Sequence, residues 1–283
     1  MENTVSIDDF LGCDQMPIDI IILGTGDSVG TPKLACRCET CELARGRGVP
    51  FSRMRFGILL VHSSNSGPSN ATNILVDTGP DLRIQLLRAR IEDIDAILWT
   101  HMHYDHMVGF GDFYHNKNNI EVFSTEETLN FIKNFRFKVK TTPHPLEAYV
   151  PIDYSGLKIT PFYVLHKSAL TKPIGFLIED ETSKKIVITG DTGFNIPEES
   201  LKLIQNASPD VLITDMFTDT DTERFKEVHM SISEAIRFAQ ISNAKETYLM
   251  HMSHRCKPHD ELEKYLESYE HIHIAYDTQK ISL

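Results

Sequence analysis

The sequence predicts a single α/β domain, and three observations support this. Short apolar runs rich in β-branched residues alternate with stretches of helical periodicity along the chain. Heptads, internal repeats and low-complexity blocks are absent from the sequence. The 283 residues, 41% of them hydrophobic, are enough to bury the core of one large domain. We therefore expect one compact domain over residues 18–283, preceded by an N-terminal extension of residues 1–17.

The apolar runs predict about a dozen strands, because each run is short and rich in residues that favour extended backbone. The predicted strands are Ile18–Leu23, Ile58–Val61, Asn73–Asp77, Ala96–Thr100, Ile120–Phe123, Leu157–Leu165, Ile174–Glu179, Lys185–Thr189, Val211–Thr214, Thr247–His251 and His271–Tyr276. The Ser, Asn, Gly and Pro residues of Ser63–Asn70 predict a turn between two strands of one sheet.

Helical patterns occupy the stretches between these strands. The predicted helices are Asp81–Arg90, Thr125–Phe135, Glu198–Gln205, Ser231–Ile241 and His259–Tyr269. The fourth is the clearest, because Ser231 and Glu234 have the spacing of a capping box at its start. His229 is therefore expected at the end of a loop, just before that helix.

The charge balance and the chain start exclude some classes of protein. Forty acidic against 28 basic residues give a formal net charge of -12, which argues against an extended surface for nucleic acid. No apolar run approaches the length of about 18 residues that a membrane helix needs. Residues 1–17 lack the basic and apolar regions of a signal peptide. We expect a soluble, cytoplasmic protein that has no membrane partner.

The strongest local signal is a cluster of metal-ligand side chains. His101, His103, Asp105 and His106 lie within six residues, directly after the predicted strand Ala96–Thr100. Three histidines and an aspartate at this spacing indicate a metal site rather than a polar turn.

Three further ligand-type residues follow predicted strands. His166, Asp191 and His251 each come at the carboxyl end of a strand, where α/β sheets usually place their sites. Each alone would more often be a structural residue. Together with the histidine cluster, they predict one shared site.

The cysteines predict a second metal site. Cys36, Cys38 and Cys41 are too close in sequence for a disulfide framework, and three thiolates can bind one zinc ion. The spacing alone leaves the fourth ligand open, with His254, Cys256 and His259 as candidates.

The order of these motifs resembles the metallo-β-lactamase fold superfamily. H-x-H-x-D-H, a strand-end His, G-D-T and a second strand-end His follow one another, and the similarity runs from Ile18 to the last His-bearing strand. The resemblance implies a four-layer αββα sandwich with a two-metal site at one edge. It implies that one metal is bound by His101, His103 and His166, that the other is bound by Asp105, His106 and His251, and that Asp191 bridges them. The two ions would be Mn or Zn.

A narrower resemblance concerns the glycine turns and the cysteines. Gly24–Gly26, Gly30–Pro32, C-x-C-x-x-C and the H-M-S-H stretch that ends at His254 are similar to the carbon-phosphorus lyase accessory phosphodiesterase subfamily, which opens a ribosyl 1,2-cyclic phosphate. This implies that His254 completes a structural zinc knot at residues 36–41 and that His229 donates a proton to the departing oxygen. Asp105 could act as a base as well as a ligand. A protein of pyrroloquinoline quinone biosynthesis shares the zinc pattern.

The resemblance predicts a phosphodiesterase that hydrolyses small phosphodiesters, including cyclic ribose phosphates, with a hydroxide held by two metals. Asp191 disfavours a β-lactamase, since those members often carry Cys at this position. Two alternatives stay open: a tRNA 3′-processing nuclease, although only 24 residues separate His166 from Asp191, and a non-catalytic accessory protein of the pyrroloquinoline quinone type. We expect the loops Gly109–Asn119 and Lys138–Val150 to wall the substrate pocket. A homodimer is compatible with the sequence.

Overall fold

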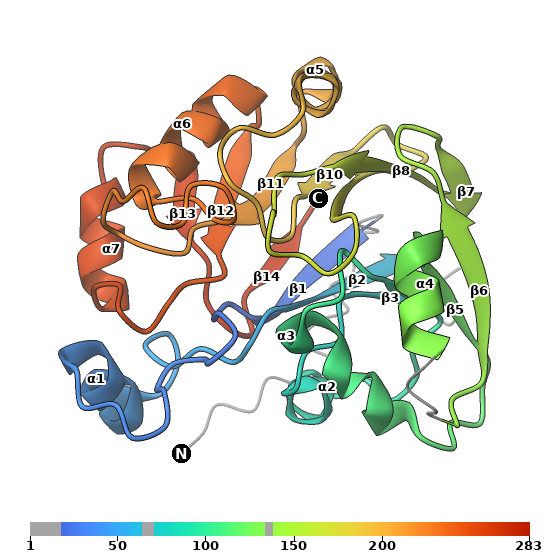
Figure 1. Cartoon of the computed structure of the whole chain (residues 1–283), viewed down its shortest axis with the longest axis horizontal. Coiled ribbons are helices and arrows are strands. Elements are labelled where there is room, and N and C mark those ends of the chain that lie inside the picture. The colour runs from blue at the N-terminus through green and yellow to red at the C-terminus, as the bar shows by residue number, and fades with distance from the viewer. Residues whose placement is uncertain (1–17, 64–70, 134–137) are drawn as a thin grey trace.

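The computed structural model describes residues 18–63, 71–133 and 138–283 (Figure 1). The N-terminal extension, residues 64–70 of the expected turn and the end of the helix expected at Thr125–Phe135 lie outside these ranges. The strands are β1 Ile18–Gly24, β2 Gly57–Ser63, β3 Ala71–Val76, β4 Ala96–Leu98, β5 Ile120–Thr125, β6 Thr141–Leu146, β7 Ile152–Tyr154, β8 Leu157–Tyr163, β9 Ile174–Glu179, β10 Lys185–Ile188, β11 Val211–Asp215, β12 Glu246–Met250, β13 Ile272–Ile274 and β14 Lys280–Ser282. The helices are α1 Glu39–Arg47, α2 Leu82–Ala89, α3 Tyr104–Met107, the 3₁₀ turn η3 Val108–Phe113, α4 Glu126–Lys133, α5 Glu198–Ala207, α6 Ile232–Ser242 and α7 His259–Leu266.

The described strands form two seven-stranded sheets, in the orders β14-β1-β2-β3-β4-β5-β6 and β13-β12-β11-β10-β9-β8-β7. One apolar cluster joins their inner faces, with Ile20 and Ile74 from the first sheet and Ile178 and Ile213 from the second. Two further clusters lie on the outer faces, one under α2 and α4 and the other under α5, α6 and α7. Figure 1 shows the helices on either side of the paired sheets. The predicted αββα sandwich is confirmed.

Parallel pairing brings several strand ends to one edge of the sandwich. Strands β3, β4, β5 and β6 run parallel in the first sheet, and β10, β11, β12 and β13 run parallel in the second. The residues that follow β3 and β4 therefore share an edge of the first sheet, and those that follow β10, β11 and β12 share an edge of the second.

The predicted helices are present, with ends shifted by a few residues. The capping box is confirmed, because the Ser231 hydroxyl accepts a hydrogen bond from the Glu234 amide and the Glu234 carboxylate accepts one from the Ser231 amide. The sequence prediction missed α1, which follows a Cys-rich turn and buries only Cys41 and Ala44. A helix with so narrow an apolar face gives no helical periodicity.

The missed strands have local causes. Strand β6 carries Pro143 and Pro145, and prolines argue against a strand when the sequence alone is considered. The sheet tolerates them because β6 is an edge strand. Strands β7 and β14 are three residues each, too short for a period-two pattern. Among the described helices, none has the length and apolar character needed to cross a bilayer.

Candidate metal centre

Three histidine rings converge at the carboxyl ends of β4 and β8. Nε2 of His101 and Nε2 of His166 each lie 3.0 Å from Nδ1 of His103. The outer nitrogen of each ring is held by the protein: His101 Nδ1 lies 2.9 Å from the Thr100 hydroxyl, His103 Nε2 lies 2.9 Å from the Ser168 carbonyl, and His166 Nδ1 lies 2.7 Å from the Val228 carbonyl.

These hydrogen bonds place the ring protons. The Thr100 hydroxyl donates its single hydrogen to Asp77, so it accepts from His101, and the two carbonyls can only accept. Each neutral ring thus carries its proton on the outer nitrogen and directs a lone pair inward. Burial lowers the pKa of His101 well below its ordinary value and that of His166 to about 4, so both rings are neutral at pH 7. The Ser168 hydroxyl, 3.3 Å from His166 Nε2, can donate to only one of these lone pairs.

A second set of ligand atoms lies beside the first. Asp105 Oδ2 is 3.4 Å from Nε2 of His106 and 3.4 Å from Nε2 of His251. Asp191 Oδ1 is 3.3 Å from His106 Nε2 and 3.2 Å from His251 Nε2. Ligands of a tetrahedral metal with bonds of about 2.1 Å lie about 3.4 Å apart. The spacing fits a single ion.

Asp191 belongs to both sets. Its second oxygen, Oδ2, lies 3.8 Å from Nε2 of His101 and 3.8 Å from Nε2 of His166. Burial opposes its ionisation, but His106 and His251 hold the pKa of the Asp191 carboxyl well below its usual range. Each carboxylate oxygen therefore faces one set of nitrogens, which is the arrangement of a bridging ligand.

Buried polar atoms without partners support the fit to metals. Among the described residues, His106 Nε2 and Asp191 Oδ1 are buried and make no hydrogen bond. His106 Nδ1 donates to Asp77 over 2.7 Å, so the lone pair of the neutral ring lies on Nε2. Acceptors that face one another in a buried site are unfavourable unless a cation lies between them. A donor set of histidines and carboxylates suits Zn, Mn or Fe.

The backbone explains why these side chains meet. Asp105 and His106 lie on α3, a short helix that is not among those predicted from the sequence. Asp191 follows Gly190, which has φ 62° and where a Cβ would lie 2.9 Å from Thr100 Cγ2. Only glycine fits there. His251 itself adopts a left-handed φ of 67° directly after β12.

Two aspartates of the site were missed in the sequence. Asp77 is fully buried and accepts hydrogen bonds from the Thr100 amide, the Thr100 hydroxyl and His106 Nδ1. Asp215 is 1% exposed and accepts from His229 Nδ1 over 2.7 Å and from the Met230 amide over 3.2 Å. Both residues lie at the carboxyl end of a strand, as Asp191 does. The strand-end rule could therefore have found them.

His229 lies between the two ligand sets. Its ring centroid is 5.0 Å from that of His166 and 5.1 Å from that of His251. Because His229 Nδ1 donates to Asp215, its Nε2 is free to exchange a proton with a substrate. The sequence prediction placed this residue correctly at a loop end before α6.

The candidate ligands of the predicted zinc knot lie around His254. Its Nδ1 lies 3.6, 3.8 and 3.7 Å from the Sγ atoms of Cys36, Cys38 and Cys41. The other two candidates have different partners: Cys256 Sγ donates to the Phe217 carbonyl, and His259 Nδ1 accepts from Arg53. Three sulfurs and one nitrogen could hold a metal, and zinc prefers such a set.

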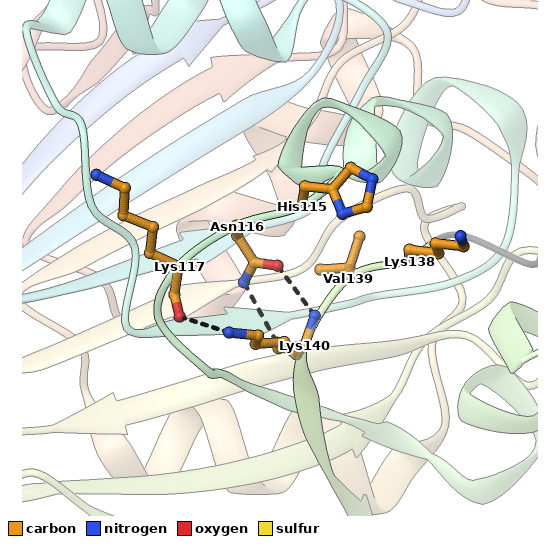
Figure 2. A pocket seen from close by; sticks show the side chains of 6 residues that line it. All are labelled: His115, Asn116, Lys117, Lys138, Val139 and Lys140. Carbon is orange, nitrogen blue, oxygen red and sulfur yellow. Dashed lines mark hydrogen bonds between the residues drawn. The ribbon is translucent and has the colours of Figure 1, made fainter.

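A basic surface hollow lies away from these clusters. Figure 2 shows its lining residues, which are His115, Asn116, Lys117, Lys138, Val139 and Lys140. They precede β5 and β6, so they lie at the amino ends of parallel strands, the edge opposite to His101 and Asp77. Phe110 is 3% exposed and packs against Trp99. These parts of the two loops do not wall the candidate site, contrary to the sequence expectation.

Comparison with curated proteins gives two relatives of interest. An octanoyltransferase of Porphyromonas gingivalis is 26% identical over 275 residues, which cover 91% of this chain and 50% of that protein. Exodeoxyribonuclease WalJ of Streptococcus pneumoniae is 28% identical over 170 residues, which cover 56% of this chain and 61% of that protein. The matches thus span only about half to three fifths of the relatives' own length.

Solved structures are similar over nearly the whole chain. A diphosphatase from the PhnP family has a TM-score of 0.77 and 25% identity, over 94% of this chain and 98% of that one. Zinc-bound PqqB from Methylobacterium extorquens has a TM-score of 0.76 and 18% identity, over 94% and 100%. The short form of human tRNase Z has a TM-score of 0.66 and 19% identity, over 93% and 98%. The last two show the fold alone.

The model of the beta-lactamase superfamily domain matches residues 72–252. That range contains both sets of converging ligand atoms, which belong to His101, His103, Asp105, His106, His166, Asp191 and His251. The chain therefore belongs to the beta-lactamase superfamily and has the metallo-β-lactamase fold.

Proposed function

We propose that this protein is a dinuclear-metal-dependent hydrolase of small phosphodiesters, with cyclic ribose phosphates among its substrates. The observation that carries the proposal is the position of Asp191, whose two oxygens each face one set of ligand nitrogens. His101, His103 and His166 would hold one ion, and Asp105, His106 and His251 the other. Two such ions, when bound, polarise the phosphoryl group and provide a nucleophile at neutral pH.

The chain's own residues orient the ligands and move a proton. Thr100, Ser168 and Val228 fix the ring positions of the first set through their oxygens. His229 would donate a proton from Nε2 to the departing oxygen, and Asp215 would stabilise the charged ring through Nδ1. Asp105 would serve as a ligand and could also accept a proton.

The comparisons support phosphorus chemistry. The PhnP-family protein is a diphosphatase by name, with 25% identity over nearly the full length of both chains. The net charge of -12 favours a small substrate over a polymer. His254 and the cysteines support the same subfamily, with zinc as the structural ion at the knot.

A nuclease is the second candidate, because one curated relative is an exodeoxyribonuclease that is 28% identical over 170 residues. A short single-stranded DNA is the substrate that distinguishes a nuclease from a hydrolase of small diesters. Faster release of nucleotides from DNA than of nitrophenol from a small diester would favour this candidate over the small-diester hydrolase.

The test compares metal-free protein with protein reconstituted with Mn or Zn. We expect turnover of bis(p-nitrophenyl) phosphate only after reconstitution, and loss of turnover in Asp105→Asn but not in Asp153→Asn, a matched change of an exposed aspartate on β7. An octanoyl thioester serves as the control substrate, since one relative is an octanoyltransferase. Two bound metals without diester turnover, or faster thioester hydrolysis, would contradict the proposal.

A further inference from the structure

The ring of His229 is in contact with more than the two ligand histidines. Phe217 stacks on it with a centroid distance of 4.5 Å and an interplanar angle of 13°. Phe225 in turn packs edge-on against Phe217, at 4.8 Å and 63°. Aromatic contacts at these distances restrict the orientation of a ring more than an aliphatic neighbour would.

The backbone of Phe217 is held from two sides. Its amide donates to the Met230 carbonyl over 2.9 Å, beside His229 in the sequence. Its carbonyl accepts from the Ser253 amide over 3.0 Å and from Cys256 Sγ over 3.3 Å. Ser253 and Cys256 flank His254, the histidine of the knot. Phe217 therefore has a fixed place between the knot and the loop that carries His229.

The hydrogen bond from His229 Nδ1 to Asp215 does not restrain rotation of the ring about the axis of that bond. The ring can still tilt about the axis of this bond, and that tilt would move Nε2 away from the reacting atoms. The face-on contact with Phe217 opposes this motion. A general acid must lie within hydrogen-bond reach of the oxygen that it protonates, so small tilts matter.

We propose that Phe217 is a positioning residue, which holds the His229 ring so that its Nε2 can protonate the leaving oxygen of a substrate. This inference rests on the proposed function. As the bond from phosphorus to the leaving oxygen breaks, the electron pair stays on that oxygen and the Nε2 proton moves to it. His229 is left neutral, with its remaining proton on Nδ1 and still hydrogen-bonded to Asp215. The effect of Phe217 is thus largest for substrates whose leaving group needs a proton.

The test uses two diesters that differ only in the leaving group. Methyl p-nitrophenyl phosphate releases a stable phenolate without help, whereas methyl phenyl phosphate gains from protonation. A positioned acid contributes about 10² to 10⁴ in rate. We therefore expect Phe217→Leu to lower kcat for the phenyl diester by at least about tenfold and to change kcat for the nitrophenyl diester less than about twofold, with KM little changed.

Two variants separate positioning from a loss of structure. Phe217→Tyr keeps the aromatic face and should retain turnover of both diesters. Phe113→Leu is the matched control, because Phe113 is a half-buried phenylalanine on η3 that packs against Phe110. In a His229→Ala background, Phe217→Leu should cause no further loss, since both changes remove the same step. An equal loss on both diesters, or additive losses, would overturn the proposal.

A measurement independent of turnover is the ¹⁵N spectrum of the His229 ring in zinc-loaded protein. The wild type and Phe217→Tyr should show sharp ring signals of one orientation with the proton on Nδ1, and Phe217→Leu should keep this tautomer but show signals broadened by ring motion. An unchanged spectrum in Phe217→Leu would overturn the positioning role. If the wild type hydrolyses neither diester but the spectra differ as expected, the proposed function fails while the positioning of His229 stands.

Discussion

The two ligand clusters of this protein are built in opposite ways. The candidate dinuclear centre takes its ligands from segments that follow β4, β8, β10 and β12, far apart in the chain, and most of them are buried. The knot takes three of its four ligands from Cys36–Cys41, and its cysteines range from buried to exposed. The candidate centre forms where strands of two packed sheets end, and the knot is a local turn closed by His254.

This difference predicts whether the fold or the bound metal fixes the positions of the ligands in each cluster. At the candidate dinuclear centre, carbonyl, hydroxyl and carboxylate oxygens hold the outer ring nitrogens, so the fold itself orients the candidate ligands. At the knot, the sulfur atoms contact chiefly one another, His254 and the Lys33 amide. The knot should thus depend on its metal for structure, whereas the centre should depend on its metals for activity.

The largest expected effect is that of Asp191→Ala on turnover. Removal of the residue that both sets share should lower diester hydrolysis by more than about a thousandfold and reduce the bound metal at the centre. The thermal midpoint should change little, because the sheets remain packed. Metal analysis gives the bound metal, and differential scanning calorimetry gives the thermal midpoint. Retained activity would show that the two sets do not act together.

Cys41→Ser should show the reverse pattern. Burial raises the pKa of the Cys41 thiol to about 12, so metal binding must deprotonate a group that otherwise stays neutral. The variant should lose about one metal per chain and roughly 5 to 10 °C of thermal midpoint, with turnover of the nitrophenyl diester within about threefold. Cys256→Ser is the control, and its metal content should not change. An unaltered midpoint in Cys41→Ser would argue against a structural knot.

Asp77→Asn tests whether the fold orients the ligands of the centre. The carboxylate accepts from His106 and from Thr100, and an amide can accept at one oxygen only. We expect metal affinity or turnover to fall about 10- to 100-fold. The knot metal should stay bound. Equilibrium dialysis gives the metal affinities. A metal affinity and a turnover equal to those of the wild type would show that Asp77 does not orient the ligands of the centre.

The smallest expected effect is a dependence of stability on pH, to which His259 contributes. Burial and the Arg53 guanidinium lower its pKa to about 4, and the unfolded value is near 6.5. The unfolded state then binds more protons between these values, so stability is lost as pH falls from about 6.5 to 4. His259→Gln should reduce this loss by about 2 to 3 kcal/mol between pH 7 and 4.5, by urea unfolding.

Other groups titrate in the same range, but they are common to both proteins. Burial raises the pKa of Asp277 to about 6, so its contribution runs in the opposite direction and is lost as pH rises. Loss of metal at low pH also affects both. The difference between wild type and His259→Gln isolates His259, and equal pH dependence in the two proteins would contradict the assigned cause.

Much of the site could be predicted because the ligands are marked by local sequence. H-x-H-x-D-H, G-D-T and C-x-C-x-x-C each combine rare residue types at fixed spacing, and strand-end positions supplied His166 and His251. Asp77 and Asp215 were missed because a single aspartate after a strand is common. The strand-end rule marks them as candidates, and their contacts to His106 and His229 then assign them to the site.

The sequence by itself determined the α/β class, most element positions and the residues able to bind metal, because periodicity and ligand spacing are local properties. The tertiary structure brought His254 to the three cysteines and directed one Asp191 oxygen to each set of nitrogens, as the resemblance implies, and it alone placed Phe217 against His229. These depend on how two sheets pack and on which strand ends become neighbours. Such contacts join residues that lie between 12 and 218 positions apart in the chain, so local spacing alone does not encode them.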